Sequence, residues 1–141
     1  KKIEKMFAED ILEKRGIRVE IIDPRTIAKK KKKSGNNEKL IINSVKKTGN
    51  CIVADNDWLH CGFSAEVAAR VSEKCFGSLE RPVKRIGFAE IPCPTARHLE
   101  NEFYPNAKNI IREVENMLGL ERMDFSGIEF YSHEKKFRGP F

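Results

Sequence analysis

The chain has 141 residues, of which 40% are hydrophobic, and this is enough apolar material for the core of one domain. No apolar run approaches the roughly 20 residues that a membrane-spanning helix needs, and the N-terminus has no secretory pattern, so the sequence predicts a cytoplasmic protein without a membrane span. The formal net charge of +6 is concentrated in Lys29 to Lys33 and after residue 134, which gives nucleic-acid binding little support.

The N-terminal part of the chain predicts a helix followed by a strand. Residues 3–15 repeat apolar side chains at helical spacing, and Gly16 is placed to stop the helix. Residues 17–22 are rich in isoleucine and valine, which predicts a buried strand ended by Asp23 and Pro24. A polar loop over residues 25–36 follows.

Two further helix–strand alternations and a last helix follow. Asn37 is expected to cap a helix over residues 38–47, before a strand at 51–55. Ser64 is expected to cap a helix that ends at Cys75, and Pro82 precedes a strand at 83–88. A proline-rich loop then leads to a helix over residues 105–118.

Helices and short strands thus alternate about every 30 residues, which is typical of an α/β layer fold with a parallel sheet. Functional groups in such sheets usually lie in the loops beyond the carboxyl ends of the strands. These loops begin here at Asp23, Asp55 and Phe88.

Three segments in those regions resemble a known family. GIRVEIIDPRTI (residues 16–27), SVKKTGNCIVADNDWLHCGFSAEVAARVSE (44–73) and LERPVKRIGFAEIPCPTA (79–96) resemble motifs of the transketolase C-terminal domain. They are most similar to the beta subunits of thiamine-diphosphate-dependent 2-oxo acid dehydrogenases of the pyruvate, branched-chain and acetoin types. The resemblance covers residues 8 to 118 and implies a three-layer α/β/α sandwich with a mostly parallel sheet.

The departures from the family pattern suggest the domain organisation. Residues 1–120 are expected to form the domain, with residues 28–36 as an inserted, solvated, lysine-rich loop. Residues 121–141 form an aromatic and basic C-terminal extension, expected to cover a surface of the domain or to bind a partner. Cys61 and Gly62 stand where the family has two glycines, and Arg81 replaces a small residue before Pro82.

The resemblance also implies what this domain does. In the family, thiamine diphosphate and magnesium bind between two other domains, marked by a GDG…N motif and an activating glutamate, and neither mark is present here. No catalytic, cofactor-binding or metal-binding residue is therefore expected. The chain is interpreted as an assembly and docking domain of a longer or split enzyme, located in the mitochondrial matrix if eukaryotic. Its expected partners are the thiamine-binding domains or an alpha subunit, in a homodimer or heterotetramer, and a dihydrolipoyl acyltransferase core.

Two surfaces carry the candidate site residues. By resemblance, the aromatic-rich loop after the second predicted strand and the helix that follows form a subunit interface, with Trp58, His60, Phe63 and Glu66 as candidates. The alternative is local packing of the aromatic side chains over that helix. By resemblance, Glu80 with its neighbour Arg81 belongs to the docking surface for the acyltransferase core; the alternative is a solvated loop carboxylate.

Other chemistry has weaker support in the sequence. His60–Cys61 and Cys93…His98 lack the closely spaced ligand pairs of structural zinc sites. The four cysteines contain no CxxC pair, which predicts reduced thiols, with Cys51 and Cys75 as small core residues.

Two functional alternatives remain open. A transketolase or 1-deoxyxylulose-phosphate synthase relative would use the lysine run for an anionic substrate. A stand-alone basic module would bind nucleic acid or an acidic protein in a salt-dependent way.

Overall fold

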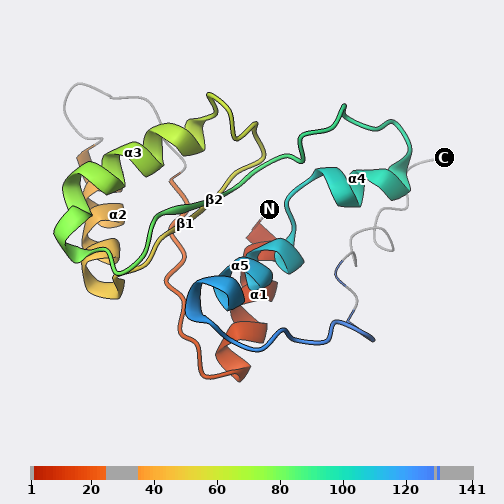
Figure 1. The fold of residues 1–141 in the computed structure, drawn as a ribbon, viewed down its shortest axis with the longest axis horizontal. Helices are drawn as coiled ribbons and strands as arrows, with labels where there is room; N and C mark the ends of the chain where they lie inside the picture. Colours follow the sequence, from red (N-terminus) through yellow and green to blue (C-terminus); the bar gives the residue numbers. More distant parts are fainter. Residues whose placement is uncertain (1, 25–34, 129, 131–141) are drawn as a thin grey trace.

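The computed structural model describes residues 2–24, 35–128 and 130 (Figure 1). Its elements in chain order are α1 (Lys2–Lys14), α2 (Gly35–Thr48), β1 (Ile52–Ala54), α3 (Phe63–Cys75), the 3-10 helix η1 (Phe76–Ser78), β2 (Lys84–Ile86), α4 (Arg97–Phe103) and α5 (Ala107–Leu118). Within these residues, no helix is long and apolar enough to cross a membrane. Residues 28–34 of the predicted lysine-rich loop and most of the C-terminal extension lie outside the described residues, whereas Gly35 and Asn36, predicted as the end of that loop, begin α2.

The strands β1 and β2 form a parallel pair that is connected through α3. Val53 lies opposite Arg85 in the register. The pairing continues past the carboxyl ends of both strands, where the Phe88 N–H donates to the Asp57 carbonyl over 3.0 Å. A parallel pair with a helical crossover is the unit of α/β folds, so the predicted fold class and the strands predicted at 51–55 and 83–88 are confirmed.

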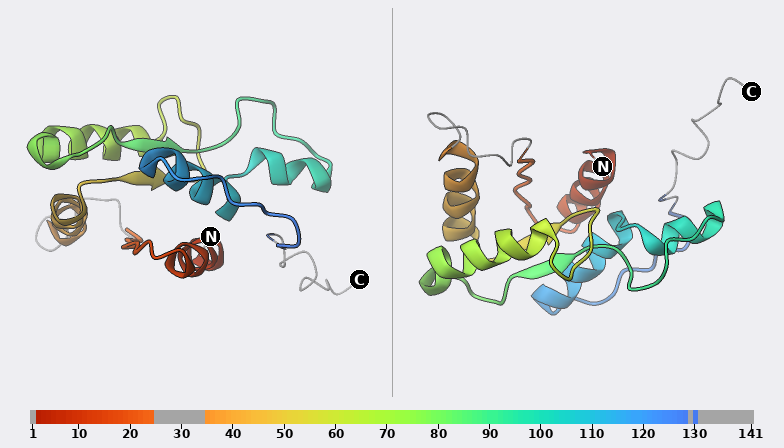
Figure 2. Two further views of the ribbon diagram at one scale, coloured as in Figure 1. Left: turned by 60° about the horizontal axis from the view of Figure 1, so that its bottom comes forward. Right: turned by 90° about the horizontal axis from the view of Figure 1, so that it is seen from above.

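Two apolar clusters lie against this strand pair. One joins α1 and α5 around Leu12 and Ile111, and the other joins α2 and α3 around Val71. At the start of β1, Cys51 packs against the α2–α3 cluster and Ile52 against the α1–α5 cluster. Because successive strand residues point to opposite faces, the two helix pairs cover the two faces of the sheet. Figures 1 and 2 show the strands running between the α2–α3 pair and the α1–α5 pair.

The prediction of a strand at residues 17–22 is wrong, because the described residues of this segment belong to no sheet. Side-chain burial alternates along the segment: Ile17 and Val19 pack against the α1–α5 cluster, while Arg18 and Glu20 are exposed. The segment nevertheless pairs with neither described strand, and the described sheet has two strands. The period-two pattern therefore reflects one-sided burial, whereas a strand also needs a neighbouring backbone for its hydrogen bonds.

Two predicted helix caps are also wrong. Helix α2 begins at Gly35, which puts Asn37 inside its first turn. Helix α3 begins at Phe63 after Gly62, and Ser64 is a buried residue within it. The carboxylate of Asp57 serves as the cap instead, because its Oδ2 accepts a hydrogen bond from the Phe63 N–H over 3.3 Å.

The C-terminal part contains one helix that the sequence reading missed. The seven-residue α4 ends at Phe103, and Tyr104 after it stands just before a proline, where helical backbone is disfavoured. Helix α5 then begins with a capping box between Asn106 and Asn109, and it is followed by Gly119 with a φ of +65°. Its predicted end at Leu118 is confirmed.

Candidate functional site

An aromatic cluster lies at the carboxyl end of the strand pair and consists of Trp58, Phe88, Phe103 and Tyr104. The Trp58 ring meets the rings of Phe88 and Phe103 edge-on, with centroid distances of 5.6 Å and 5.8 Å. Phe88 stacks on Phe103 at 4.7 Å, and Tyr104 meets both edge-on. Phe103 is buried, while Trp58 remains 44% exposed. The cluster thus combines a buried phenylalanine ring with an accessible indole that packs against it. Partly exposed tryptophan side chains held in this way are common in protein–protein interfaces.

The loop that carries Trp58 is tightly constrained. Asp57 Oδ1 accepts a hydrogen bond from the Trp58 N–H over 2.8 Å. Arg85 from β2 donates to the Leu59 carbonyl over 2.6 Å. A Cβ atom at Gly62 would lie 1.9 Å from the Trp58 carbonyl oxygen, so this position requires glycine. Cys61 has a φ of +57°, a left-handed conformation that is strained for a side chain other than glycine.

The other three predicted interface residues do not join the aromatic cluster: His60 lies in the same loop, and Phe63 and Glu66 lie in the first turn of α3. His60 and Glu66 are exposed, and Phe63 is half-buried at the start of α3. Glu66 pairs with Arg70 on its own helix at 2.6 Å. Sequence reasoning missed Phe88, Phe103 and Tyr104. Phe88 was recognisable as the residue that ends a predicted strand at the same sheet edge, but the other two depend on α4.

The predicted docking residue Glu80 is folded onto the turn between α2 and β1. Its backbone N–H donates to the Gly49 carbonyl over 2.8 Å, and a Cβ atom at Gly49 would lie 2.8 Å from the Glu80 side chain. The Glu80 carboxylate is 3.1 Å from Arg81, whose guanidinium also donates to Asn50 over 3.1 Å. The Glu80 side chain is 64% exposed, so the carboxylate is accessible but already paired.

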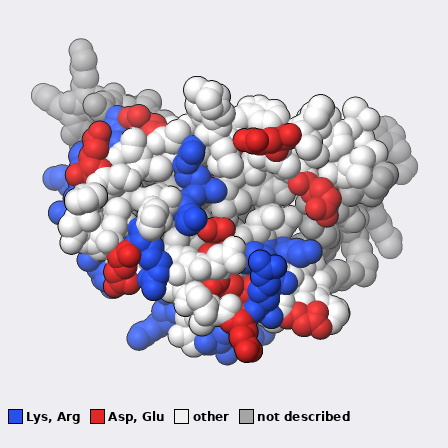
Figure 3. Space-filling model, in the orientation of Figure 1, with Lys and Arg blue, Asp and Glu red and all other residues white. Residues whose placement is uncertain are grey.

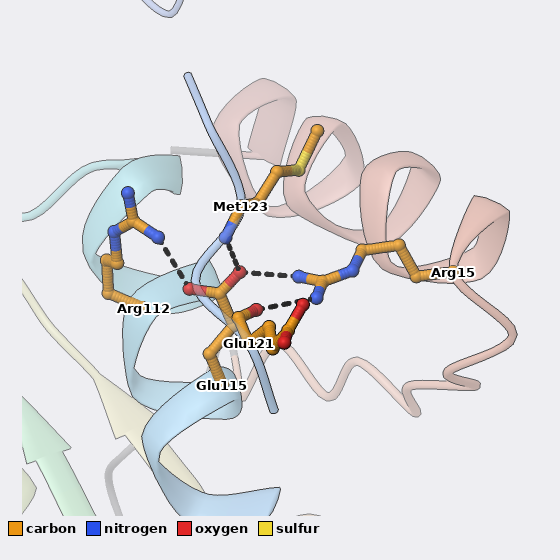
Figure 4. Close-up of polar contacts among 5 residues, drawn as sticks. All are labelled: Arg15, Arg112, Glu115, Glu121 and Met123. Atoms are coloured by element: carbon orange, nitrogen blue, oxygen red, sulfur yellow. Dashed lines mark hydrogen bonds and ion pairs between the residues drawn. The ribbon is translucent and has the colours of Figure 1, made fainter. Parts of the chain in front are cut away.

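A buried carboxylate on α5 forms a polar cluster with two arginines and a backbone N–H. We call Glu115, Arg15 and Arg112 the carboxylate clamp (Figure 4). Glu115 is 1% exposed, and it accepts hydrogen bonds from Arg15 over 2.5 Å, from Arg112 over 2.7 Å and from the Met123 N–H over 2.8 Å. Burial acts to raise the pKa of Glu115, but the hydrogen bonds from Arg112, Met123 and Arg15 together lower it below its ordinary value.

Sequence reasoning missed the carboxylate clamp. The available signal was an acidic residue on the apolar stripe of α5, four residues after the fully buried Ile111. Arg15, its partner 100 residues away, carries no local signal of this role.

The cysteines show no metal-binding arrangement. Among the described residues, no group of three or more His, Cys, Asp or Glu side chains could hold a metal ion. Cys75 is buried and Cys51 half-buried in the α2–α3 cluster, where burial and, secondarily, the nearby Cys75 raise the pKa of Cys51 to about 11. The Cys51 thiol is therefore unreactive at neutral pH, and Cys75 is a buried core residue. Cys61 and Cys93 are exposed.

Charges are mixed on the face shown in Figure 3, where acidic and basic side chains alternate across the described surface. Charged side chains of the described residues also form partly exposed pairs, such as Lys74 with Glu38 and Lys84 with Glu113. Such interspersed pairs are typical of a solvated surface rather than a polyanion-binding face.

Comparison with known proteins gives a family match that coincides with this fold. A family model described as "Transketolase, C-terminal domain" matches residues 4–110, which include all three sequence motifs, both strands, the Trp58 loop and α4.

Individual relatives point the same way. The chain is 34% identical over 112 residues to the mitochondrial pyruvate dehydrogenase E1 component subunit beta of Dictyostelium discoideum, covering 79% of this chain and 30% of that protein. It is 32% identical over 108 residues to the acetoin:2,6-dichlorophenolindophenol oxidoreductase subunit beta of Bacillus subtilis, covering 77% of this chain and 30% of the relative. The pyruvate dehydrogenase E1 component subunit beta of Rickettsia bellii is 34% identical over 110 residues, with 78% of this chain and 32% of the relative covered. The chain thus spans about 30% of the length of these relatives.

Proposed function

The chain belongs to the transketolase C-terminal domain family, and on this basis we propose that it is the C-terminal assembly domain of a thiamine-diphosphate-dependent 2-oxo acid dehydrogenase beta subunit. The main support for the proposal is the family match over residues 4–110. The relatives that are beta subunits of the pyruvate and acetoin types agree with it. The reaction of the complete enzyme would be oxidative decarboxylation of a 2-oxo acid with acyl transfer to lipoamide.

The described residues of this chain do not fit the magnesium and thiamine diphosphate that the family implies. Magnesium with thiamine diphosphate needs several oxygen ligands, and the described residues contain no cluster of three candidate metal ligands. The sequence also lacks the GDG…N motif. We therefore assign no catalytic step to this chain and place the cofactor in other domains or an alpha subunit.

The proposed contact with those domains is the aromatic cluster and the adjoining start of α3. Trp58 is 44% exposed yet braced by Phe88 and Phe103, so it would enter a partner surface with little loss of conformational freedom. His60, Phe63 and Glu66 would contribute to the rim of the same interface. A homodimer or an α2β2 heterotetramer would bury this surface.

A docking role for Glu80 toward a dihydrolipoyl acyltransferase core is also proposed. The Arg81 pair reduces the field of the carboxylate, so a basic partner would have to compete with a guanidinium 3.1 Å away. Such competition favours a weak contact that sets orientation rather than affinity.

The proposal predicts that the isolated chain does not decarboxylate 2-oxo acids. The assay combines the purified chain with thiamine diphosphate, magnesium, a 2-oxo acid panel and an artificial electron acceptor, before and after addition of the thiamine-binding domains of a beta subunit together with an alpha subunit. Turnover that requires the added domains and subunit, and their co-purification with the chain, supports the assembly role. Turnover by the chain alone that survives re-purification, or failure of the chain to associate with the added components, would refute it.

A further inference from the structure

The first part of the C-terminal extension packs back onto the domain. The family match ends at residue 110, but residues 121–128 and 130 continue along the α1–α5 face. Four apolar side chains of this segment pack against the α1–α5 cluster: Met123, Phe125, Ile128 and Phe130. Arg122, Asp124 and Ser126, which flank Met123 and Phe125, are exposed. The segment therefore presents alternate side chains to the domain, as an extended peptide does in a groove.

The carboxylate clamp forms two hydrogen bonds with the backbone of this segment, one as acceptor and one as donor. Glu115 Oε1 accepts the Met123 N–H over 2.8 Å, and Arg15 Nη2 donates to the Glu121 carbonyl over 2.9 Å (Figure 4). Of the three clamp residues, Arg15 directly follows α1 and Glu115 lies in α5, and their own ion pair of 2.5 Å holds these two together. A donor and an acceptor fixed in this way match the backbone of an extended peptide.

Two basic side chains of α5 lie over the ring of Phe125, two residues after Met123, and we call Arg112 and Lys108 the cationic seat. The Arg112 guanidinium carbon lies 4.0 Å from the centroid of the Phe125 ring, and the Lys108 ammonium lies 5.9 Å from it. Arg112 also donates to Glu115 over 2.7 Å, so the seat and the backbone clamp share a residue. Phe130 then meets Phe125 edge-on at 4.9 Å.

A tight turn gives the segment its shape. Asp124 accepts a hydrogen bond from the Ser126 N–H over 2.9 Å, and Gly127 has a φ of +81°. The Ile128 N–H donates to the Phe125 carbonyl over 3.1 Å, which closes the turn and returns the chain to the apolar face.

We propose that the α1–α5 face with its carboxylate clamp is a peptide-binding groove, occupied in cis by residues 121–128 and Phe130 and able to bind the same segment in trans once the cis copy is displaced. The ligand class is an extended peptide with an apolar side chain at one position and an aromatic side chain two residues later. The proposal is independent of the assembly function, because its contacts lie on residues 15, 108–115, 121–128 and 130 and not at the aromatic cluster. The cis segment would act as a strap that keeps the groove closed.

The first arm of the test removes one backbone donor in the full-length chain. Met123→Pro deletes the N–H that Glu115 accepts and changes no charge. Hydrogen exchange read by mass spectrometry should show amides of residues 120–130 exchanging at least tenfold faster, while those near Ile111 in α5 stay protected. Phe125→Ala, which empties the cationic seat, should have the same effect and serves as the second variant. Glu113→Gln removes a charge from the same helix outside the clamp and should leave the exchange of this segment unchanged.

The second arm asks whether the released groove accepts a peptide. A fluorescently labelled synthetic peptide of residues 120–130 is titrated against the wild-type chain and the Met123→Pro variant, with a peptide carrying proline at position 123 as control. The peptide should bind the variant at least tenfold more tightly than the wild type, because a strap in cis competes at millimolar effective concentration. Exchange that is equally fast in wild type and variants would overturn the strap. A peptide that binds both chains equally, binds neither, or binds as well with the added proline would overturn the groove.

Discussion

Replacing Glu115 by alanine should destabilise the domain by about 3 kcal/mol. Removing one partner of a buried ion pair generally costs about 3–5 kcal/mol, because the remaining charge stays buried. The side chains of Arg15 and Arg112 are 26% and 29% exposed, so both can recover part of their hydration, and we expect the lower end of that range. Glu113→Ala is the matched control on the same helix. Glu113 lies 3.7 Å from a half-exposed Lys84, and its loss should cost less than about 1 kcal/mol.

The pH dependence gives a second, sharper readout of the same site. The pKa of Glu115 is lowered in the folded state, so its charge stabilises the fold above the unfolded pKa, about 4.3, and this stabilisation is lost as the pH falls through the folded pKa. Wild-type stability should therefore decrease more steeply on acidification below about pH 4 than that of Glu115→Gln. Urea unfolding followed by circular dichroism at pH 7, 5, 4 and 3 measures both curves. Parallel curves for the two proteins would refute the assignment of Glu115 as the carboxylate held ionised by the two arginines.

Three further predictions concern the loops at the carboxyl edge of the strands and the docking surface. Trp58→Ala should weaken subunit association by about 2 kcal/mol, measured by sedimentation. It should also lower the free energy of unfolding in urea by about 1–2 kcal/mol, because two ring contacts are lost. Unchanged association would remove Trp58 from the interface. Cys61→Gly should raise stability by about 0.5 kcal/mol by relieving the left-handed strain, whereas Cys61→Val should lower it; equal urea midpoints would contradict this. Glu80→Lys should reduce binding of the cognate subunit-binding domain at least tenfold while shifting stability by less than about 0.5 kcal/mol; isothermal titration that gives equal affinities would exclude a docking role.

The sequence by itself determined the fold class, the family and most of the element order. The strands at 51–55 and 83–88 and the helix between them follow from local periodicity and from motifs that lie within about 30 residues of one another. Such patterns are readable because helices and strands bury side chains at characteristic intervals. The end of α5 was equally readable, because Gly119 supplies the left-handed conformation that terminates a helix.

The tertiary structure alone decided the contacts that make the surfaces. Periodicity showed that Ile17 and Val19 are covered, but not that the segment lacks a strand partner among the described residues. The joining of Arg15 to Glu115 across 100 residues depends on how α1 crosses α5, which no local pattern encodes. The same holds for Trp58 and Phe103, which meet only because α4 forms and packs beside the strand ends. A sequence pattern indicates which side chains are buried, whereas the packing of distant elements decides which partner each one meets.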